Sequence, residues 1–247
     1  MKRISIVIPA YNEETRVEKT VRAYHQFFQA LQKKNELDYE LLIVPNGCTD
    51  NTESIVHKLS DELQKIVIKK IPGAGKGIAV KAGFLDALTR ENDLIGFVDA
   101  DMATQPKYFY DLVKHIGDYD GIIASRYMKG AQVYPPRPFI KRWGSKIFFQ
   151  GLVKLLFGMH YQDTQCGAKL FKRAVVESIT PHMQMPQWAF DIELLYLCKR
   201  FGFKIKEYPT VWYDQADSKL QMMRSGLHML GSLVRLRMRY MPFKKLS

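Results

Sequence analysis

Short β-branched runs alternate with helical patterns from Ile4 to Val98, and this alternation restricts the fold more than any other feature. Ile4–Ile8 predicts a first strand, and a helix capped near Asn12 follows. The apolar stripe of that helix is Val17, Val21, Tyr24, Phe28 and Leu31. Further strands are expected at 40–44, 65–70 and 94–98, and further helices at 51–64 and 77–88. Such βαβ units predict an α/β fold whose mostly parallel sheet carries helices on both faces.

The sequence contains no internal repeat, low-complexity tract or linker, so one domain is expected over residues 1–220. Residues 221–247 are expected to form a basic amphipathic segment near a membrane. The longest apolar stretch outside the predicted strands is interrupted by Gln150 and Lys154, and it is shorter than the ~20 residues that a spanning helix needs. The three cysteines show no metal-binding spacing, so free thiols in a reducing compartment are expected.

Two acidic residues directly follow the predicted strand 94–98, in the sequence Asp99-Ala100-Asp101. Ligands of open α/β sheets bind at the carboxyl ends of strands, and Mg²⁺ is commonly held by one or two carboxylates together with substrate phosphates. The pair therefore indicates a metal-diphosphate site. The alternative is a solvated turn in which one Asp caps the helix that begins near Pro106.

The glycine-rich segment Pro72–Gly77 leads into the predicted helix 77–88. Glycines allow a backbone to approach a phosphate, and a helix N-terminus supplies free N–H groups and partial positive charge. The segment matches neither the P-loop nor the dinucleotide fingerprint. A tight turn between a strand and a helix is the competing interpretation.

The formal net charge of +12 is concentrated in two parts of the chain. Residues 121–162 contain seven basic residues and no acidic one, and residues 199–247 contain eleven basic and three acidic ones. Both parts interleave basic positions with apolar ones at helical spacing, as in Arg142, Lys146, Gln150 and Lys154 and again in Arg224, His228, Ser232, Arg235 and Arg239. The pattern favours helices lying on an anionic membrane surface. Buried core helices are the alternative, and nucleic acid is not expected because no binding motif is present.

Four segments in this order resemble the family 2 glycosyltransferases of GT-A fold: 4–14, 99–101, 163–171 and 188–195. The similarity is greatest to the branch that uses polyprenyl or dolichyl phosphate. Within that branch, Asp-Ala-Asp-x-Ala-Thr, Asp-Thr-Gln-Cys-Gly-x-Lys-Leu-Phe and Trp-Ala-Phe-Asp-x-Glu-Leu-Leu resemble the β-glucosyltransferases more than the mannosyl enzymes, which usually have Gln where this chain has Ala103.

The resemblance implies a GT-A three-layer sandwich and a role for each matching position. Asp99 and Asp101 would hold Mg²⁺ or Mn²⁺, and with Ala100 they would meet the diphosphate. Asp163, on the acceptor side, would be a base or a positioning residue; a loop acid bonded to Thr164 or Arg173 is the alternative. The other implied nucleotide-sugar residues are Pro9, Ala10, Tyr11, Asn12, Glu13, Asn46, Lys76 and Ser218, and the other implied catalytic residues are Arg126 and Lys219.

Two departures from the family pattern concern the donor. The family usually reads Asp-Asp-Gly-Ser after its second strand, whereas this chain reads Pro45-Asn46-Gly47-Cys48, which leaves the identity of the nucleotide open. Ala103 lacks a metal-binding side chain, so water or substrate oxygens would complete the coordination. Phe190 and Leu194 are expected in the core with Trp188, while Asp191 and Glu193 beside them are expected to face the sugar.

The resemblance implies inverting transfer of a hexose, with glucose favoured, from a nucleotide sugar such as UDP-glucose to a polyprenyl or dolichyl phosphate. The protein would lie at the cytoplasmic face of a membrane, where a small integral membrane protein could recruit it. Three alternatives remain: a soluble or polysaccharide acceptor, GDP-mannose as donor, and a basic binding module without catalytic activity.

Overall fold

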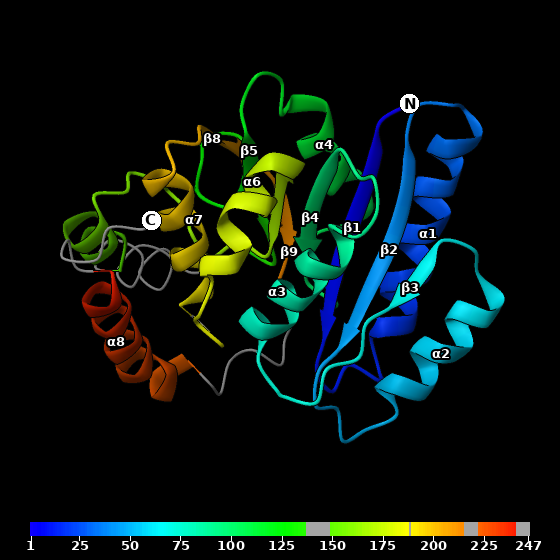
Figure 1. Cartoon of the computed structure of the whole chain (residues 1–247), viewed down its shortest axis with the longest axis horizontal. Coiled ribbons are helices and arrows are strands. Elements are labelled where there is room, and N and C mark those ends of the chain that lie inside the picture. The colour runs from blue at the N-terminus through cyan, green and yellow to red at the C-terminus, as the bar shows by residue number, and fades with distance from the viewer. Residues whose placement is uncertain (137–148, 188, 215–221, 241–247) are drawn as a thin grey trace.

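The computed structural model describes residues 1–136, 149–187, 189–214 and 222–240. Within these ranges seven strands form one sheet in the order β3-β2-β1-β4-β7-β5-β8 (Figure 1). The strands are β1 Arg3–Ala10, β2 Asp38–Pro45, β3 Ile66–Ile68, β4 Leu94–Val98, β5 Gly121–Ser125, β7 Ala168–Lys172 and β8 Ile205–Pro209. All neighbours are parallel except β7, which runs antiparallel to β4 and β5. The predicted mostly parallel sheet is confirmed.

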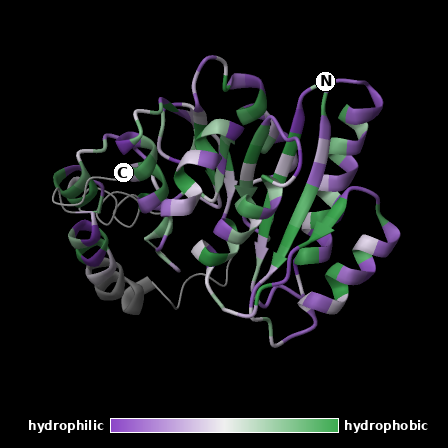
Figure 2. Ribbon diagram, viewed as in Figure 1, coloured by the Kyte–Doolittle hydropathy of each residue, from purple (hydrophilic) through white to green (hydrophobic). Residues whose placement is uncertain are grey.

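Helices cover both faces of this sheet. They are α1 Val17–Lys33, α2 Thr52–Glu62, α3 Lys76–Ala87, α4 Pro106–His115, α6 Arg173–Ile179, α7 Phe190–Arg200 and α8 Met222–Arg239, with a short 3₁₀ turn η1 at Thr180–His182. One core lies between the sheet and α1, α2 and α4, and the other lies between the sheet and α3, α6, α7 and α8. Figure 2 shows hydrophobic residues concentrated in the strands, whereas the helices carry both hydrophobic and hydrophilic residues. The three-layer α/β architecture is therefore confirmed.

Strand β1 shows why its apolar run is continuous. Ile4, Ile6 and Ile8 enter the core that contains α1, whereas Val7 enters the opposite core. Side chains of a strand alternate between the two faces of a sheet, so a strand covered on both faces must be apolar at nearly every position. The predicted stripe of α1, from Val17 to Leu31, is buried against the same sheet face.

The predicted cap of α1 is wrong in position. Helix α1 begins at Val17 with Arg16 as its N-cap residue, and no side chain caps it. Asn12 instead has a left-handed backbone (φ 53°), and its amide exchanges hydrogen bonds with Thr49. The residue that resembled a cap fastens two loops together, and this tertiary contact overrides the local helix signal.

The helices of the basic, apolar regions are buried on one side and exposed on another. Residues 149–157 are helical, and Val153 and Phe157 join Leu233 and Leu236 of α8 in the core. Other apolar side chains on the two helices are exposed, including Leu155 at 81%, Val234 at 48% and Met238 at 60%. Arg142 and Lys146 lie outside the described residues, and no helix in the described ranges is long and apolar enough to cross a bilayer.

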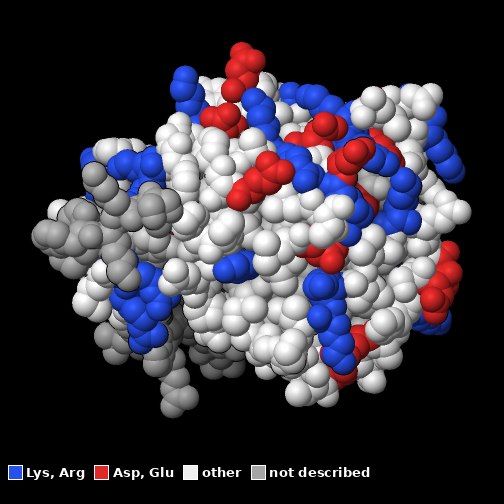
Figure 3. All heavy atoms as spheres, in the orientation of Figure 1, with Lys and Arg blue, Asp and Glu red and all other residues white. Residues whose placement is uncertain are grey.

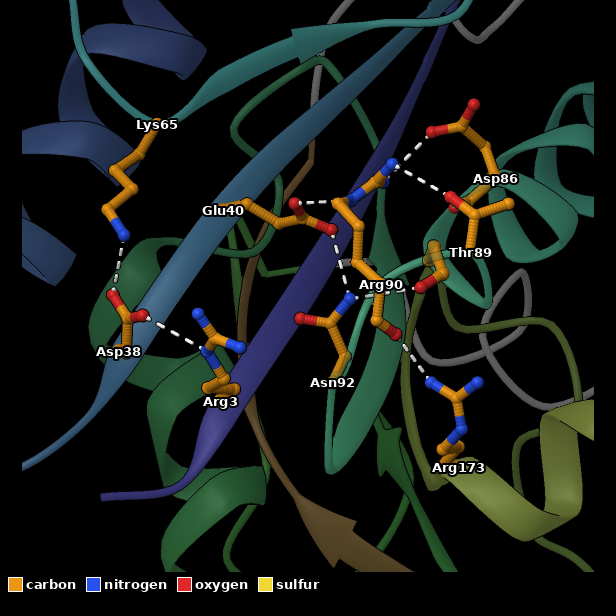
Figure 4. A network of polar contacts seen from close by, with 10 residues as sticks. Arg3, Asp38, Glu40, Lys65, Asp86, Thr89, Arg90, Asn92 and Arg173 are labelled. Carbon is orange, nitrogen blue, oxygen red and sulfur yellow. Dashed lines mark hydrogen bonds and ion pairs between the residues drawn. The ribbon is translucent and has the colours of Figure 1, made fainter.

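At the amino-terminal edge of the sheet, polar contacts join β2, the segment between α3 and β4, and the start of α6 (Figure 4). Glu40 of β2 accepts hydrogen bonds from Arg90 at 2.7 Å and from Asn92 at 3.1 Å, and Arg173 donates to the Arg90 carbonyl at 2.5 Å. A cavity of about 340 Å³ lies here, lined partly by Arg3, Glu40 and Arg90. This edge is opposite to the carboxyl ends of β1, β2 and β4.

The close packing of β4 on β7 predicts the effect of adding one methyl group at Gly96. A Cβ atom at Gly96 would lie 2.5 Å from the Lys169 carbonyl oxygen. We expect Gly96→Ala to lower the free energy of unfolding by about 1–3 kcal/mol, as overpacking does, in chemical denaturation. Gly151→Ala is the matched control, because nothing lies within 4 Å of that position. It should be neutral or stabilising, and an equal loss in both variants would contradict the packing argument.

Candidate functional site

The sheet order places the ends of β2, β1 and β4 side by side. Ala10 at the end of β1 is paired in register with Pro45 at the end of β2, and β4 lies on the other side of β1. The segments that follow these strands therefore share one edge. They are 9–13, 46–50 and 99–101, and each contains at least one residue that was predicted to contact a nucleotide sugar.

The side chain of Lys76, at the start of α3, forms an ion pair with Asp99. Two residues further on, Asp101 accepts a hydrogen bond from the backbone of Ala103 at 2.9 Å. Burial raises the pKa of Asp101, and the nearby charge of Asp99 raises it further. Burial opposes the positive charge of Lys76, but Asp99, Asp191 and Asp101 together outweigh that effect and raise the pKa of Lys76. Negative charge is thus concentrated here, with a lysine as its neutralising partner.

This donor set fits a divalent cation that is also held by a substrate. Among the described residues, no group of three or more His, Cys, Asp and Glu side chains is placed to hold a metal. Asp99 and Asp101 therefore offer two carboxylates, and the remaining ligands would have to be phosphate or water oxygens. Such incomplete protein coordination is typical of Mg²⁺ bound with substrate phosphates.

Aromatic rings and a second ion pair surround the ammonium group of Lys76. It lies 5.8 Å from the ring centre of Phe97 and 5.7 Å from that of Phe190. The fully buried Lys169 lies 5.2 Å from the centre of the same Phe97 ring and donates to Asp191 at 2.5 Å. The Lys169–Asp191 pair was not predicted from the sequence, although a lysine within the apolar segment 168–172 was a signal for it. Asp191 has a lysine partner inside the protein.

The first predicted nucleotide segment is held by the start of α2 and by Arg16. The Glu13 backbone donates to Thr52 at 2.7 Å, and its side chain pairs with Arg16 at 2.7 Å. Burial raises the pKa of Glu13, although Arg16 lowers it in part. Tyr11 is 49% exposed, so its ring is available to a ligand. Pro9 and Ala10 belong to the end of β1.

Asn46 connects two loops of the site. In the amide orientation that satisfies both neighbours, its nitrogen donates to the Ala10 carbonyl at 2.7 Å and its oxygen accepts from the Gly75 backbone at 3.0 Å. The side chain is only 1% exposed. An aspartate could not donate to Ala10, so asparagine suits this position. The amide of Asn46, which was predicted to contact the nucleotide sugar, joins the end of β1 to the glycine-rich turn.

Arg126 and Asp163 form a bidentate ion pair. The guanidinium donates to the two carboxylate oxygens at 2.7 and 2.9 Å, and the Arg126 backbone donates to the carboxylate at 2.9 Å. Burial opposes both charges, but the pairing is stronger: Arg126 lowers the pKa of Asp163, and Asp163 raises the pKa of Arg126. The partner is Arg126, not Thr164 or Arg173. These contacts favour a positioning role for Asp163 over that of a base.

The loop from Asp163 to Gly167 connects this ion pair with the acid pair. The Asp99 backbone donates to the Gly167 carbonyl at 3.2 Å, and a Cβ atom at Gly167 would lie 1.9 Å from an Asp99 carboxylate oxygen. Only glycine leaves space for Asp99 at that position. Burial raises the pKa of the intervening Cys166 to about 12, so its side chain remains a thiol.

The remaining predicted positions complete the comparison between sequence and structure. Ala100 is 3% exposed, and its carbonyl accepts a hydrogen bond from Thr20 at 2.6 Å. The expectation that Glu193 faces the sugar is wrong, because its side chain is fully buried and accepts hydrogen bonds from the backbone of Gln184 and Met185. Ser218 and Lys219 lie outside the described residues, as does Trp188. The predicted free cysteines are confirmed.

The sequence profile described as "Glycosyl transferase family 2" matches residues 5–180. The chain belongs to this family. Its membership confirms the resemblance noted in the sequence and the assignment as a glycosyltransferase. The matched range contains Asp99, Asp101, Arg126 and Asp163, so the site lies within the part that defines the family.

Three curated relatives are each 30–32% identical to this chain over nearly its whole length. The dolichyl-phosphate beta-glucosyltransferase of Dictyostelium discoideum is 32% identical, and the match covers 96% of this chain and 75% of that protein. The protein of the same name from Saccharomyces cerevisiae is 31% identical over 96% of this chain and 75% of its own length. Glycosyltransferase AglD of Haloferax volcanii is 30% identical over 94% of this chain, which spans only 36% of AglD.

Solved structures support the fold. Glucosyl-3-phosphoglycerate synthase of Mycobacterium tuberculosis, solved with Mn²⁺, UDP and phosphoglyceric acid, superimposes with a TM-score of 0.70. That match covers 96% of this chain and 78% of the other at 18% identity, so the likeness concerns the fold. The same enzyme has also been solved with Mg²⁺ and UDP. The expected GT-A architecture is confirmed.

The buried pair of Arg126 and Asp163 predicts a large effect on stability. Asp163→Asn leaves the buried guanidinium without its counter-charge, and we expect a loss of about 3–5 kcal/mol in the free energy of unfolding at pH 7, measured by chemical denaturation. Asp111→Asn is the matched control, because Asp111 pairs with Lys114 at the surface. This variant should lower the free energy of unfolding by less than ~1 kcal/mol.

The difference in unfolding free energy between the parent and Asp163→Asn should decrease as the pH falls. The pKa of Asp163 is lower in the folded protein than its ordinary value, so the ion pair contributes its full stability above the unfolded pKa of about 4. The contribution declines as the pH falls through the folded pKa. The difference between the parent and Asp163→Asn should therefore narrow in acid, and a difference that widens below pH 4 would contradict the assignment.

Proposed function

We propose that this glycosyltransferase transfers glucose from UDP-glucose to a polyprenyl or dolichyl phosphate, with inversion at the anomeric carbon. The observation that carries the proposal is the acid pair Asp99 and Asp101, which lies half-buried beside Lys76 at the carboxyl edge of the sheet. The relatives named dolichyl-phosphate beta-glucosyltransferase support the choice of sugar and acceptor. The neighbour solved with UDP supports the nucleotide.

Asp99 and Asp101 would hold Mg²⁺ or Mn²⁺ against the diphosphate. When bound, the ion supplies a Lewis acid that neutralises the charge developing on the leaving UDP. Lys76 can then exchange its Asp99 contact for a diphosphate oxygen, where its positive charge assists departure. The neighbouring rings of Phe97 and Phe190 limit where the ammonium group can move.

The acceptor phosphate needs little activation. A phosphate monoester with a second pKa near 6 is largely dianionic at neutral pH, so its oxygen can attack the anomeric carbon as the bond to UDP breaks. We assign Arg126 to the acceptor phosphate and Asp163 to the orientation of Arg126. The hydrogen bonds of Asp163 to the side chain and backbone of Arg126 support this division of roles.

Membrane binding at α8 belongs to the same proposal. Arg235, Arg237 and Arg239 alternate with other residues along the end of α8, and the neighbouring Val234 and Met238 are exposed. At the end of the molecule that carries α8, Figure 3 shows blue side chains and no red ones among the described residues, whereas both signs mix over the β1–β3 half. An anionic bilayer complements such a surface. We place it on the cytoplasmic side, where recruitment by a small integral membrane protein would also fit.

Donor and acceptor identity can be tested directly with purified protein. With Mn²⁺ or Mg²⁺ and a polyprenyl phosphate, labelled UDP-glucose should yield a glucosylated lipid. GDP-mannose and a soluble acceptor are the comparison reactions. If only GDP-mannose or only a soluble acceptor reacts, the sugar or the acceptor assignment is overturned.

A substitution of Asp101 tests whether this carboxylate holds the metal ion. Asp101→Asn should lower activity by at least about 100-fold and weaken Mn²⁺ binding in the presence of UDP, measured by calorimetry. Asp61→Asn on the exposed side of α2 is the matched control and should leave both unchanged. Parental activity in Asp101→Asn would exclude a metal role for this carboxylate.

Membrane binding should follow the charge of α8. Each basic residue near an anionic surface contributes about 1 kcal/mol, so the double variant Arg235→Ala/Arg239→Ala should bind phosphatidylserine vesicles roughly 30-fold more weakly in co-sedimentation. The variant Lys19→Ala/Lys58→Ala removes the same charge from α1 and α2. Equal losses in both would show that net charge, not the α8 surface, controls binding.

A further inference from the structure

Glu193 of α7 is a buried carboxylate that contacts backbone amides instead of a cation. The Gln184 backbone donates to its carboxylate oxygens at 3.0 Å, and the Met185 backbone donates at 2.8 Å. No ion pair joins Glu193 to a lysine or arginine in the part of the chain that the structure describes. Burial raises the pKa of Glu193, whereas these backbone N–H groups lower it. Glu193 therefore fixes the segment Met183–Pro186 from one side.

The opposite side of the same segment contacts the start of α3. The Pro186 carbonyl accepts a hydrogen bond from the Gly77 backbone at 2.9 Å, and the Met183 carbonyl accepts one from Lys81 at 2.6 Å. A Cβ atom at Gly77 would lie 2.2 Å from the Met185 carbonyl oxygen, so the contact is tight. Segment 183–186 thus lies between Glu193 and the turn that carries Lys76.

A hydroxyl group extends this chain of contacts to the last turn of the described C-terminal region. Tyr240 follows α8, and its hydroxyl lies 3.0 Å from Glu193 Oε1 and 2.7 Å from the His182 carbonyl. Its ring packs edge-on against Tyr196 of α7, at 5.8 Å between centroids, and is 6% exposed. Leu236, one turn earlier, is fully buried. The position of Tyr240 consequently depends on how α8 packs against α7.

We infer that Glu193 is a positioning residue for Lys76, and that Tyr240 couples this function to the seating of α8 on α7. The inference rests on the proposed function, in which Lys76 contacts the diphosphate and α8 contacts the membrane. A displaced α8 would withdraw the Tyr240 hydroxyl from Glu193, loosen segment 183–186 and release the start of α3. Donor binding and α8 docking would then favour one another, as linked equilibria require.

The coupling predicts weaker donor binding when either residue loses its contacts. With saturating Mn²⁺, we expect calorimetry to show UDP binding about 10-fold weaker in Glu193→Gln and about 3-fold weaker in Tyr240→Phe. Tyr110→Phe is the matched control, because it removes a tyrosine hydroxyl that contacts Glu36 at 3.1 Å on the other sheet face. Its affinity should equal that of the parent.

A double-mutant cycle separates positioning from a general loss of stability. If Glu193 acts through Lys76, Glu193→Gln should weaken UDP binding in the parent but add little in a Lys76→Met background. Equal effects in both backgrounds would overturn the inference. Tyr240→Phe, which removes one oxygen atom and leaves the ring on Tyr196, keeps the test valid if Glu193→Gln fails to fold.

Hydrogen exchange distinguishes failure of this inference from failure of the proposed function. The Gly77 amide should exchange faster in Tyr240→Phe than in the parent or in Tyr110→Phe, whether or not UDP binds. Unchanged exchange at Gly77 would overturn the coupling even if UDP binds. A parent that binds no UDP with either metal, yet shows faster exchange in Tyr240→Phe, would refute the proposed donor and retain the coupling.

Discussion

The ion pair between Lys76 and Asp99 is the interaction on which the site depends. It joins the first residue of α3 to the segment that follows β4, and the surrounding groups are arranged to keep both residues in place. Gly167 leaves space for the carboxylate, while Phe97 and Phe190 flank the ammonium group. In an environment that raises the pKa of Asp101, the cation limits the repulsion between two neighbouring acids.

The sequence predicted the sheet because its signal is strong and local. Strands β1 and β4 are apolar at nearly every position, since helices cover both sheet faces, and that pattern is visible without any tertiary information. The acids that follow β4 could be assigned to the carboxyl edge for the same reason. Helix α1 was found from its stripe, but its start was misplaced because Asn12 pairs with Thr49, a residue distant in sequence.

The errors and omissions within the site share one physical cause. Lys169, Glu193 and Asn46 are polar side chains buried among partners from distant segments. A sequence shows that a polar residue is present, but it does not show whether the partner is a ligand, a backbone amide or another side chain. Glu193 was expected at the sugar for this reason, although its partners are internal. Arg126 and Asp163 were both predicted as site residues, but the ion pair between them was not predicted.

Strand β7 runs against its neighbours, and its direction has a consequence for how this enzyme could diversify. Because β7 is antiparallel to β4, the loop that precedes it, 163–167, reaches the same edge as the loops that follow β1, β2 and β4. One working surface is thereby assembled from two separate stretches of chain, an early one and a late one. In the proposed function the early stretch handles the donor and the late one the acceptor. Evolution could therefore exchange acceptors by altering residues after β5 while the nucleotide-handling stretch stays constant.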